Sequence, residues 1–341
     1  MLEKMNLKRW IALGVAVLIL GLSAISSGLS SMINKEEQIK KAESMFMQNF
    51  DPQALTEKIV KRGDANNRIL VLPIEGVIAD TEISPFVSAG YNHQALLSSF
   101  EKLKEDPSIK GIILKVNSPG GGVFESAEIH KKILELKEET KLPIWTSMGN
   151  MAASGGYYVA APTDKIYASP ETITGSIGVI MGGRNITGLM EKLGIQDQTI
   201  KSAPHKDIGS TTRPMTEEDR AILQGLIDNM YGRFVNVVAT GRNMDEGMVR
   251  TLADGRIYDG VQAQENGLVD EIGYFDDVVL AFSKEIKADN PQVIQYQTND
   301  FSSFGSFFGS LNKESELRAL SNILAGSYDN SSRPMYLHGG E

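Results

Sequence analysis

The stretch IKGIILKVNSPGGGVFESAEIHKKILELKEE, residues 109–139, decides the fold class of this chain. It begins with an apolar run of the length of a buried strand and ends with the spacing of an amphipathic helix. Between the two, Pro119 and three glycines free the backbone for conformations that other residues avoid. A strand, a glycine-rich turn and a helix in this order predict one unit of a parallel α/β sheet.

The same alternation continues on both sides of this stretch. Strands are expected at residues 68–78, 142–149, 164–169 and 175–182, and helices at residues 92–104, 245–252 and 260–265 and from Thr216 onward. The helix from Thr216 has Asp219 in the place of a capping box and carries an apolar stripe that runs from Ile222 to Phe234. Together these elements predict one α/β domain over residues 67–294, with an extended and then irregular segment at residues 195–210.

The beginning of the chain indicates a membrane anchor. Lys4, Lys8 and Arg9 precede residues 10–33, which carry no charge and are long enough to span a bilayer. The basic flank predicts a cytoplasmic N-terminus at residues 1–9 and a folded body on the outer side of the cell membrane. A cleaved secretory signal is the alternative, because it also joins a basic start to an apolar middle.

Two polar segments flank the predicted domain. Residues 34–66 have helical spacing and several charges, which predicts a linker or stalk. Residues 295–341 are rich in serine, asparagine and glycine, which predicts a flexible tail. The alternative for the tail is a segment that folds back towards the groove of a neighbouring copy.

The composition excludes several classes of function. A net charge of −9 without a basic stripe disfavours nucleic-acid binding. The absence of cysteine excludes disulfides, thiol catalysis and cysteine-ligated metals. The four histidines, at positions 93, 130, 205 and 338, do not have metal-ligand spacing, so no metal site is expected. The glycine loop lacks the phosphate-loop and dinucleotide patterns, which disfavours nucleotides.

Ser154 lies in MGNMAASGGYYVA, residues 148–160, where its neighbours have almost no side chain. The segment AASGG is close to the G-x-S-x-G elbow, which places a nucleophilic hydroxyl at a sharp turn between a strand and a helix. The amide of Gly155, and an amide near Gly121 in the glycine loop, would then bind an oxyanion. Close packing of small residues explains the same pattern without any catalysis, and the motif alone leaves both interpretations open.

A serine nucleophile needs a base, and each histidine has a weakness in that role. His93 lies far upstream, His338 lies in the tail, and His130 precedes two lysines and is expected to face solvent. His205 adjoins Lys206, which is the better candidate. A lysine acts as a base only when neutral, and burial in an apolar pocket lowers the pKa of a lysine far enough. Spacing alone could not select Lys206 among the basic residues.

The motifs NSPGGG, MAASGGYYVA, TGSIGVI, IKSAPHKDI and DGRIYDGVQAQENGLVDEIG follow one another between residues 68 and 282. As a set they resemble the signal peptide peptidases of the short, single-domain Gram-positive type. The resemblance implies a Clp-protease/crotonase-like fold of repeated β-β-α units behind an N-terminal transmembrane helix. It also implies a membrane-anchored serine endopeptidase that degrades signal-peptide remnants and other small or unfolded peptides, without a metal or cofactor.

The resemblance assigns a role to each matching residue. Ser154 matches the nucleophile and Lys206 the general base of a serine–lysine dyad. Ser176 matches a hydroxyl that orients the lysine, and Gly121 and Gly155 match the oxyanion amides. Larger relatives carry two tandem domains, whereas this chain has one copy of each motif. The resemblance also implies a homo-oligomeric ring or dome, with an octamer expected, and leaves open whether the dyad lies within one protomer or between two.

Three other functions share part of this pattern. A crotonase-like acyl-CoA enzyme would use the same glycine loop without a nucleophile, but the predicted external location is poor in coenzyme A thioesters. A catalytically inactive membrane scaffold would use the glycines and Ser154 for packing alone. A histidine-based serine protease would need a histidine near Val179, and none lies there.

Overall fold

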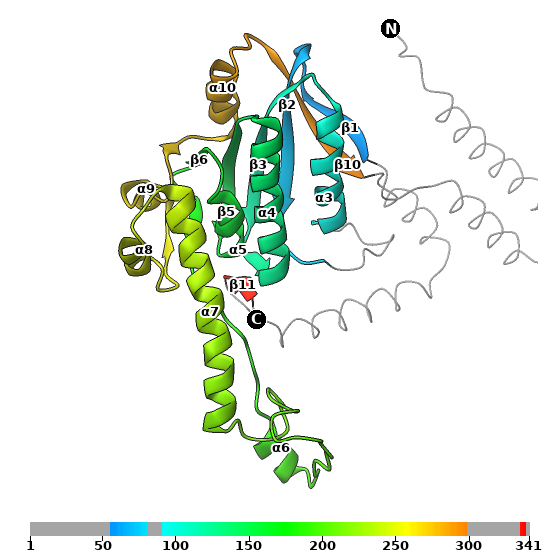
Figure 1. The fold of residues 1–341 in the computed structure, drawn as a ribbon, viewed down its shortest axis with the longest axis vertical. Coiled ribbons are helices and arrows are strands. Elements are labelled where there is room, and N and C mark those ends of the chain that lie inside the picture. The colour runs from blue at the N-terminus through cyan, green and yellow to red at the C-terminus, as the bar shows by residue number, and fades with distance from the viewer. Residues whose placement is uncertain (1–54, 81–90, 299–334, 339–341) are drawn as a thin grey trace, which may run out of the picture. The chain divides into compact units, whose positions relative to one another are not determined.

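The computed structural model describes residues 55–80, 91–298 and 335–338 (Figure 1). The predicted cytoplasmic N-terminus (1–9) and membrane anchor (10–33) lie outside the described residues, as do most of the linker and most of the tail. Within the described ranges, no helix combines the length and the apolar character that a membrane crossing needs.

A mostly parallel, mixed sheet forms the centre of the described chain, as the strand–helix alternation predicts. Its strands follow the order β1-β10-β2-β3-β5-β6-β9, and β7 and β8 extend it beside β5. The strands are β1 (Leu55–Lys61), β2 (Asp64–Glu75), β3 (Ile109–Ser118), β5 (Ile144–Ala153), β6 (Lys165–Ala168), β7 (Ile173–Gly175), β8 (Ile257–Tyr258), β9 (Glu271–Ile272) and β10 (Pro291–Thr298). Among them, β1 runs antiparallel to β10 and β8 runs antiparallel to β7. The predicted α/β class is confirmed.

The helices and a second, small sheet complete the described elements. The helices are α3 (His93–Lys102), η1 (Leu103–Glu105), α4 (Val123–Thr140), α5 (Gly155–Ala160), α6 (Thr187–Lys192), α7 (Glu217–Arg242), α8 (Glu246–Leu252), α9 (Gly260–Glu265) and α10 (Phe275–Glu285). The small sheet pairs β4 (Gly120–Gly122) with β11 (Met335–Leu337), and the two strands are antiparallel.

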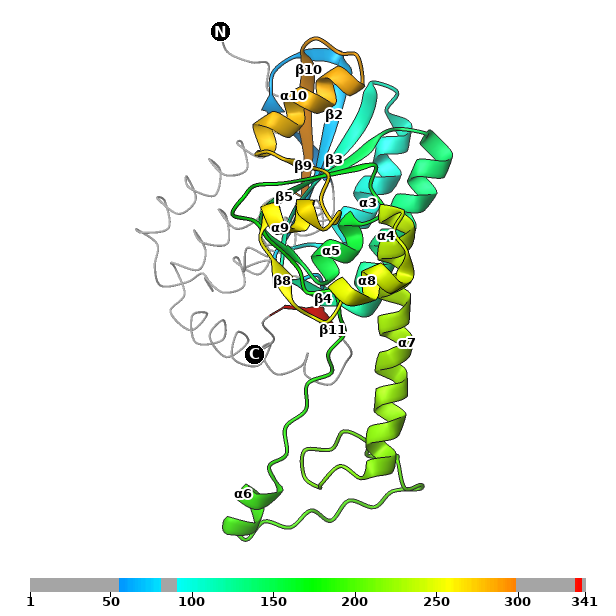
Figure 2. The ribbon, with the colours of Figure 1, turned by 90° about the vertical axis from the view of Figure 1, so that its left-hand side faces the viewer.

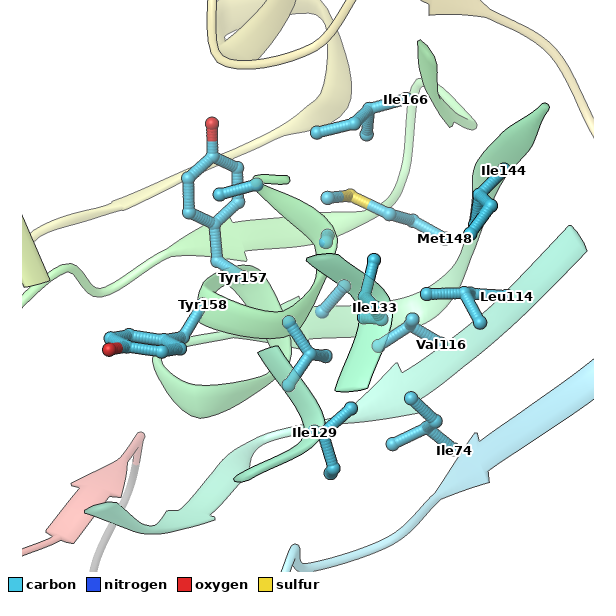
Figure 3. Close-up of a cluster of buried hydrophobic side chains, with 14 of the residues drawn as sticks. Ile74, Leu114, Val116, Ile129, Ile133, Ile144, Met148, Tyr157, Tyr158 and Ile166 are labelled. Atoms are coloured by element: carbon cyan, nitrogen blue, oxygen red, sulfur yellow. The ribbon is translucent and has the colours of Figure 1, made fainter. Parts of the chain in front are cut away.

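Both faces of the large sheet are covered, which explains why its central strands contain runs of consecutive buried apolar residues, such as 69–72 and 112–114. On β2, Leu70 and Leu72 pack into the core beneath α3 and α4. Their neighbours Ile69 and Val71 point to the other face, where Phe282 of α10 belongs to the same cluster. Figure 3 shows part of the larger core, where labelled side chains from β2, β3, α4, β5 and α5 gather.

Several element boundaries agree with the sequence analysis, and others differ: β2 covers residues 64–75 instead of 68–78, and β5 covers residues 144–153 instead of 142–149. The strand β3 begins at residue 109 as predicted, the helix at residues 260–265 has the predicted ends, and Thr216 and Asp219 form the predicted capping box. However, Leu55–Lys61 is a strand and not part of a helical stalk, and β10 continues to Thr298. The cause is long-range pairing, because β1 aligns along β10, with Leu55 opposite Thr298. The strand expected at residues 175–182 is wrong, because β7 covers Ile173–Gly175 and residues 176–182 contain only an isolated bridge at Ile180.

Residues 181–226, here called the arm, project away from the sheet (Figures 1 and 2). The arm contains α6 and the first turns of α7. The stripe on α7 behaves as predicted at Phe234, which is fully buried, whereas Ile222 and Leu226 are exposed. The large exposed apolar residues of the arm are Ile186, Leu189, Leu193, Ile195, Ile200, Met215, Ile222 and Leu226. No part of the described chain covers this apolar face.

Candidate active site

Ser154 sits at the turn between β5 and α5 in a strained conformation. Its backbone has φ 53° and ψ −117°, a combination that costs a residue with a side chain about 1–3 kcal/mol. Its N–H donates to the carbonyl of Gly175 at 2.8 Å, and its carbonyl accepts from the N–H of Tyr158 at 2.9 Å. Such strain at a strand-to-helix turn is what a nucleophile elbow requires.

The small neighbours of Ser154 support both interpretations of the motif, close packing and a nucleophile elbow. A Cβ on Gly156 would lie 2.8 Å from the carbonyl oxygen of Ser118, so this glycine allows α5 to pack against β3. Gly155 is different, because a Cβ there would enter a space surrounded by polar atoms. Packing against β3 therefore explains Gly156, whereas the open space of the candidate active site explains Gly155.

The glycine loop is held tightly beside Ser154. Ile78 accepts from the N–H of Gly122 and donates to the carbonyl of Gly120, both at 2.8 Å. A Cβ on Gly121 would lie 1.9 Å from the carbonyl oxygen of Ile78, so no other residue fits there without a backbone shift. Gly120 has φ 102°, and its N–H donates to the hydroxyl of Ser118 at 3.0 Å. The helix α4 begins directly after this loop, and its N-terminus favours negative charge nearby.

An extended segment near the C-terminus occupies this site. In the pairing of β11 with β4, Tyr336 lies opposite Gly121. On its other side, Met335 exchanges two backbone hydrogen bonds with Ile180, at 2.9 and 3.1 Å. The N–H of His338 donates to the carbonyl of Pro119 at 2.8 Å. Residues 335–338 thus lie as an added strand, which is how many proteins bind an extended peptide.

The carbonyl of Tyr336 lies beside the two predicted oxyanion amides. A Cβ on Gly120 would be 2.0 Å from this oxygen and 2.6 Å from the amide nitrogen of Gly155. A Cβ on Gly155 would be 3.0 Å from the same oxygen and 3.1 Å from the amide nitrogen of Gly121. The structure therefore brings Gly121 and Gly155 to one carbonyl group, next to Ser154.

The side chain of Tyr336 fills an aromatic pocket. Its ring stacks on Tyr158 at 4.9 Å between centroids and contacts Phe234 at 4.6 Å, and its hydroxyl donates to the carbonyl of Met230 at 3.1 Å. Burial raises the pKa of Tyr336 above its usual range. His130, which we expected to face solvent, is half-buried with its ring edge against Tyr158, and burial lowers its pKa. Sequence analysis missed this pocket, because its members come from α5, α7 and β11.

Ser176 follows the strand that runs beside Ser154. Ala153 of β5 is paired with Gly175 of β7, so the two serines each come directly after a paired residue. Ser176 also has a positive φ, 50°, and its N–H donates to the carbonyl of Arg256 at 2.8 Å. Both serines are buried. The structure thus gathers Ser154, Ser176, Gly121 and Gly155 in one region.

Lys206 lies elsewhere in the chain. Its side chain is exposed, and Nζ makes no hydrogen bond or ion pair within the described ranges. The adjacent His205 is tied to Asp219 in the first turn of α7, with Nδ1 2.8 Å from Oδ1. From Asp219 to Phe234 at the aromatic pocket, α7 rises about 22 Å. One chain therefore does not bring Lys206 to Ser154, and the pairing of these two residues stays a prediction.

A network of ion pairs holds the loop that carries Lys206. Arg213 donates two hydrogen bonds to the carboxylate of Asp207, at 2.8 and 3.0 Å, and a third to Asp219 at 2.6 Å. Lys201 adds a bond to Asp207 at 2.8 Å. The bonds from Arg213 hold the pKa of both carboxyl groups well below their usual range. The bond with Asp219 raises the pKa of His205. In the sequence these charges are separated by several residues, so their pairing is not visible there.

The fold and the site together define a serine peptidase, in which a strained serine and two convergent amides meet an extended peptide segment. A model of Peptidase family S49 matches residues 136–289. A protein of Enterococcus faecium with the provisional name signal peptide peptidase SppA is 43% identical over 344 residues, which cover 98% of this chain and 100% of that protein. The chain belongs to peptidase family S49, which confirms the resemblance seen in its motifs.

Longer relatives share the same region. Protease 4 of Salmonella typhi is 34% identical over 234 residues, which cover 69% of this chain and 37% of that protein. Serine protease SPPA, chloroplastic, of Arabidopsis thaliana is 32% identical over 181 residues, which cover 53% of this chain and 26% of the relative.

Within the described residues, no group of three or more histidine, aspartate or glutamate side chains could hold a metal ion.

Proposed function

We propose that this chain is a membrane-anchored serine endopeptidase that degrades signal-peptide remnants and other small or unfolded peptides. The observation that carries the proposal is the strand β11, which presents the carbonyl of Tyr336 to the amides of Gly121 and Gly155. The name of the Enterococcus faecium relative supports the substrate class. The uncharged residues 10–33 behind a basic start support a single-pass anchor, with the catalytic domain on the extracytoplasmic side.

Ser154 acts as the nucleophile in this proposal. Its hydroxyl loses a proton to a base and attacks the scissile carbonyl, and the resulting oxyanion accepts hydrogen bonds from Gly121 and Gly155. One such donor contributes about 3 kcal/mol to lowering the barrier. The protonated base then delivers the proton to the leaving amine, and a water molecule releases the acyl group from Ser154 by the same sequence of steps.

Lys206 from a second copy of the chain supplies the base. The arm carries Lys206 away from the Ser154 of its own chain, and it exposes an apolar face that the described chain leaves uncovered. Burial of that face against a neighbour would bring Lys206 into an apolar environment, which favours the neutral amine. Ser176, next to Ser154, orients the amine. A homo-oligomeric ring or dome, such as an octamer, closes this arrangement.

The peptide binds as an added strand between the glycine loop and Ile180. The residue whose carbonyl is attacked places its side chain in the aromatic pocket, where Tyr158 and Phe234 favour aromatic and other large apolar groups. Signal peptides are rich in such residues. The glycine-loop amides at the end of a strand also support a Clp-protease/crotonase-like fold for this chain.

A mixing experiment tests both the dyad and the assembly. Ser154→Ala and Lys206→Ala should each abolish hydrolysis of an apolar peptide while circular dichroism shows an intact fold. Co-assembled from the two inactive proteins, mixed oligomers should regain activity, because some sites then combine an intact Ser154 with an intact Lys206. A fluorophosphonate should label Ser154 alone. Full activity of Lys206→Ala, with loss in His205→Ala, would refute the dyad.

A further inference from the structure

Ser126 carries a buried hydroxyl next to the candidate oxyanion pocket. It lies in the first turns of α4, after the glycine loop, and its side chain has no exposure to solvent. Among the described residues its Oγ has no hydrogen-bond partner. A buried polar group without a partner carries a desolvation cost of about 1–3 kcal/mol, so its presence calls for a physical reason.

The position of this hydroxyl supplies a reason. Three atoms surround the point that a Cβ on Gly155 would occupy: Ser126 Oγ at 2.6 Å, the Tyr336 carbonyl oxygen at 3.0 Å and the Gly121 amide nitrogen at 3.1 Å. The hydroxyl therefore lies on the side of Gly155 where the bound carbonyl and an amide donor already meet. Because Gly155 has no side chain, nothing of that residue fills the space between them.

We propose that Ser126 Oγ–H is a third donor to the oxyanion, besides the amides of Gly121 and Gly155. This inference rests on the proposed acyl transfer to Ser154. The carbonyl carbon of Tyr336 is planar, and its oxygen accepts no hydrogen bond from the Ser126 hydroxyl. When the carbon becomes tetrahedral, its oxygen moves and gains a full negative charge, which a hydroxyl donor stabilises strongly. A donor that is unpaired with the substrate and paired in the transition state lowers the barrier without tightening substrate binding.

Two outcomes of Ser126→Ala follow from this arrangement. With an apolar peptide and the full-length protein, kcat should fall about 100-fold while KM stays unchanged, because one transition-state donor is lost. The melting temperature should stay equal or rise, because the variant removes a buried group without a partner. Ser126→Cys keeps a weaker donor of similar shape, and its kcat should lie between those of Ser126→Ala and the wild type.

Ser283→Ala is the matched control. Ser283 is also a buried helical serine, but it lies on α10, and its hydroxyl donates to the carbonyl of Val279 at 2.6 Å. This control should lower the melting temperature and leave kcat unchanged. A peptide boronate, which forms a tetrahedral adduct with the nucleophile, should bind Ser126→Ala about 100-fold more weakly than the wild type.

The outcomes separate this inference from the proposed function. Wild-type kcat and boronate affinity in Ser126→Ala would overturn the role of Ser126, even if fluorophosphonate still labels Ser154. A loss of kcat that follows a lower melting temperature would show a structural role and would also overturn it. Labelling of Ser126 itself, or no labelling of the wild type, would instead refute the assignment of Ser154.

Discussion

The strand β11 should compete with added peptide, and Tyr336→Ala should release it. The ring of Tyr336 is buried between Tyr158 and Phe234. Burial of a tyrosine ring removes roughly 150 Å² of apolar surface from water, which is worth about 4 kcal/mol. Loss of that contribution weakens docking of β11 by up to about 1,000-fold. The site should then be open to peptide most of the time.

The measurement is the binding of a fluorescent apolar peptide by anisotropy, in a Ser154→Ala background so that no peptide or tail is cut. The apparent affinity should rise at least tenfold when Tyr336→Ala is added. Tyr274→Ala is the control, since Tyr274 is an exposed tyrosine at the N-terminus of α10 and should change nothing. Equal affinities with and without Tyr336→Ala would refute competition by β11.

Three further predictions concern the candidate site and the loop that carries Lys206. Gly155→Ala should lower hydrolysis at least 100-fold with the fold intact by circular dichroism, because the new Cβ would lie 3.0 Å from the Tyr336 carbonyl oxygen and 3.1 Å from the Gly121 amide nitrogen, where the oxyanion is proposed to bind. Phe234→Ala should cost about 3–5 kcal/mol in the free energy of unfolding, measured by urea denaturation, and should weaken any preference for tyrosine substrates. The pKa of His205 is raised by its bond with Asp219, so its stabilisation of the loop is complete below about pH 6.5 and is lost as pH rises through the higher folded pKa. Hydrogen exchange at residues 201–213, corrected for intrinsic rates, should therefore quicken between pH 6 and 9, and His205→Gln should remove that dependence.

Local patterns were sufficient for much of the fold. The buried strand at residues 109–118 follows from the apolar run at its centre, and the start of α7 follows from the side-chain capping of Thr216 and Asp219. The elbow at Ser154 was also visible, since a serine among small residues between a strand and a helix matches the pattern of a nucleophile elbow. These features depend on neighbours within a few positions along the chain.

Features that depend on distant segments could not be predicted in the same way. The strand β1 exists because β10 lies beside it, although the two are separated by most of the domain. The apolar stripe of α7 predicts one buried face, but within the described chain Phe234 is buried whereas Ile222 and Leu226 are exposed. In the sequence, Ser126 does not differ from any other serine in a helix. Only the folded chain shows that its unpaired hydroxyl lies beside Gly155 and the candidate site.

The projecting arm has a kinetic consequence for the whole protein. If the base of each site comes from a neighbour, a single copy of the chain is chemically inert, because its own arm holds Lys206 away from Ser154. Specific activity should then fall steeply when the protein is diluted below the dissociation constant of the assembly, and should return on concentration. Proteolysis would begin only where copies have gathered, which spares solitary chains and the proteins around them.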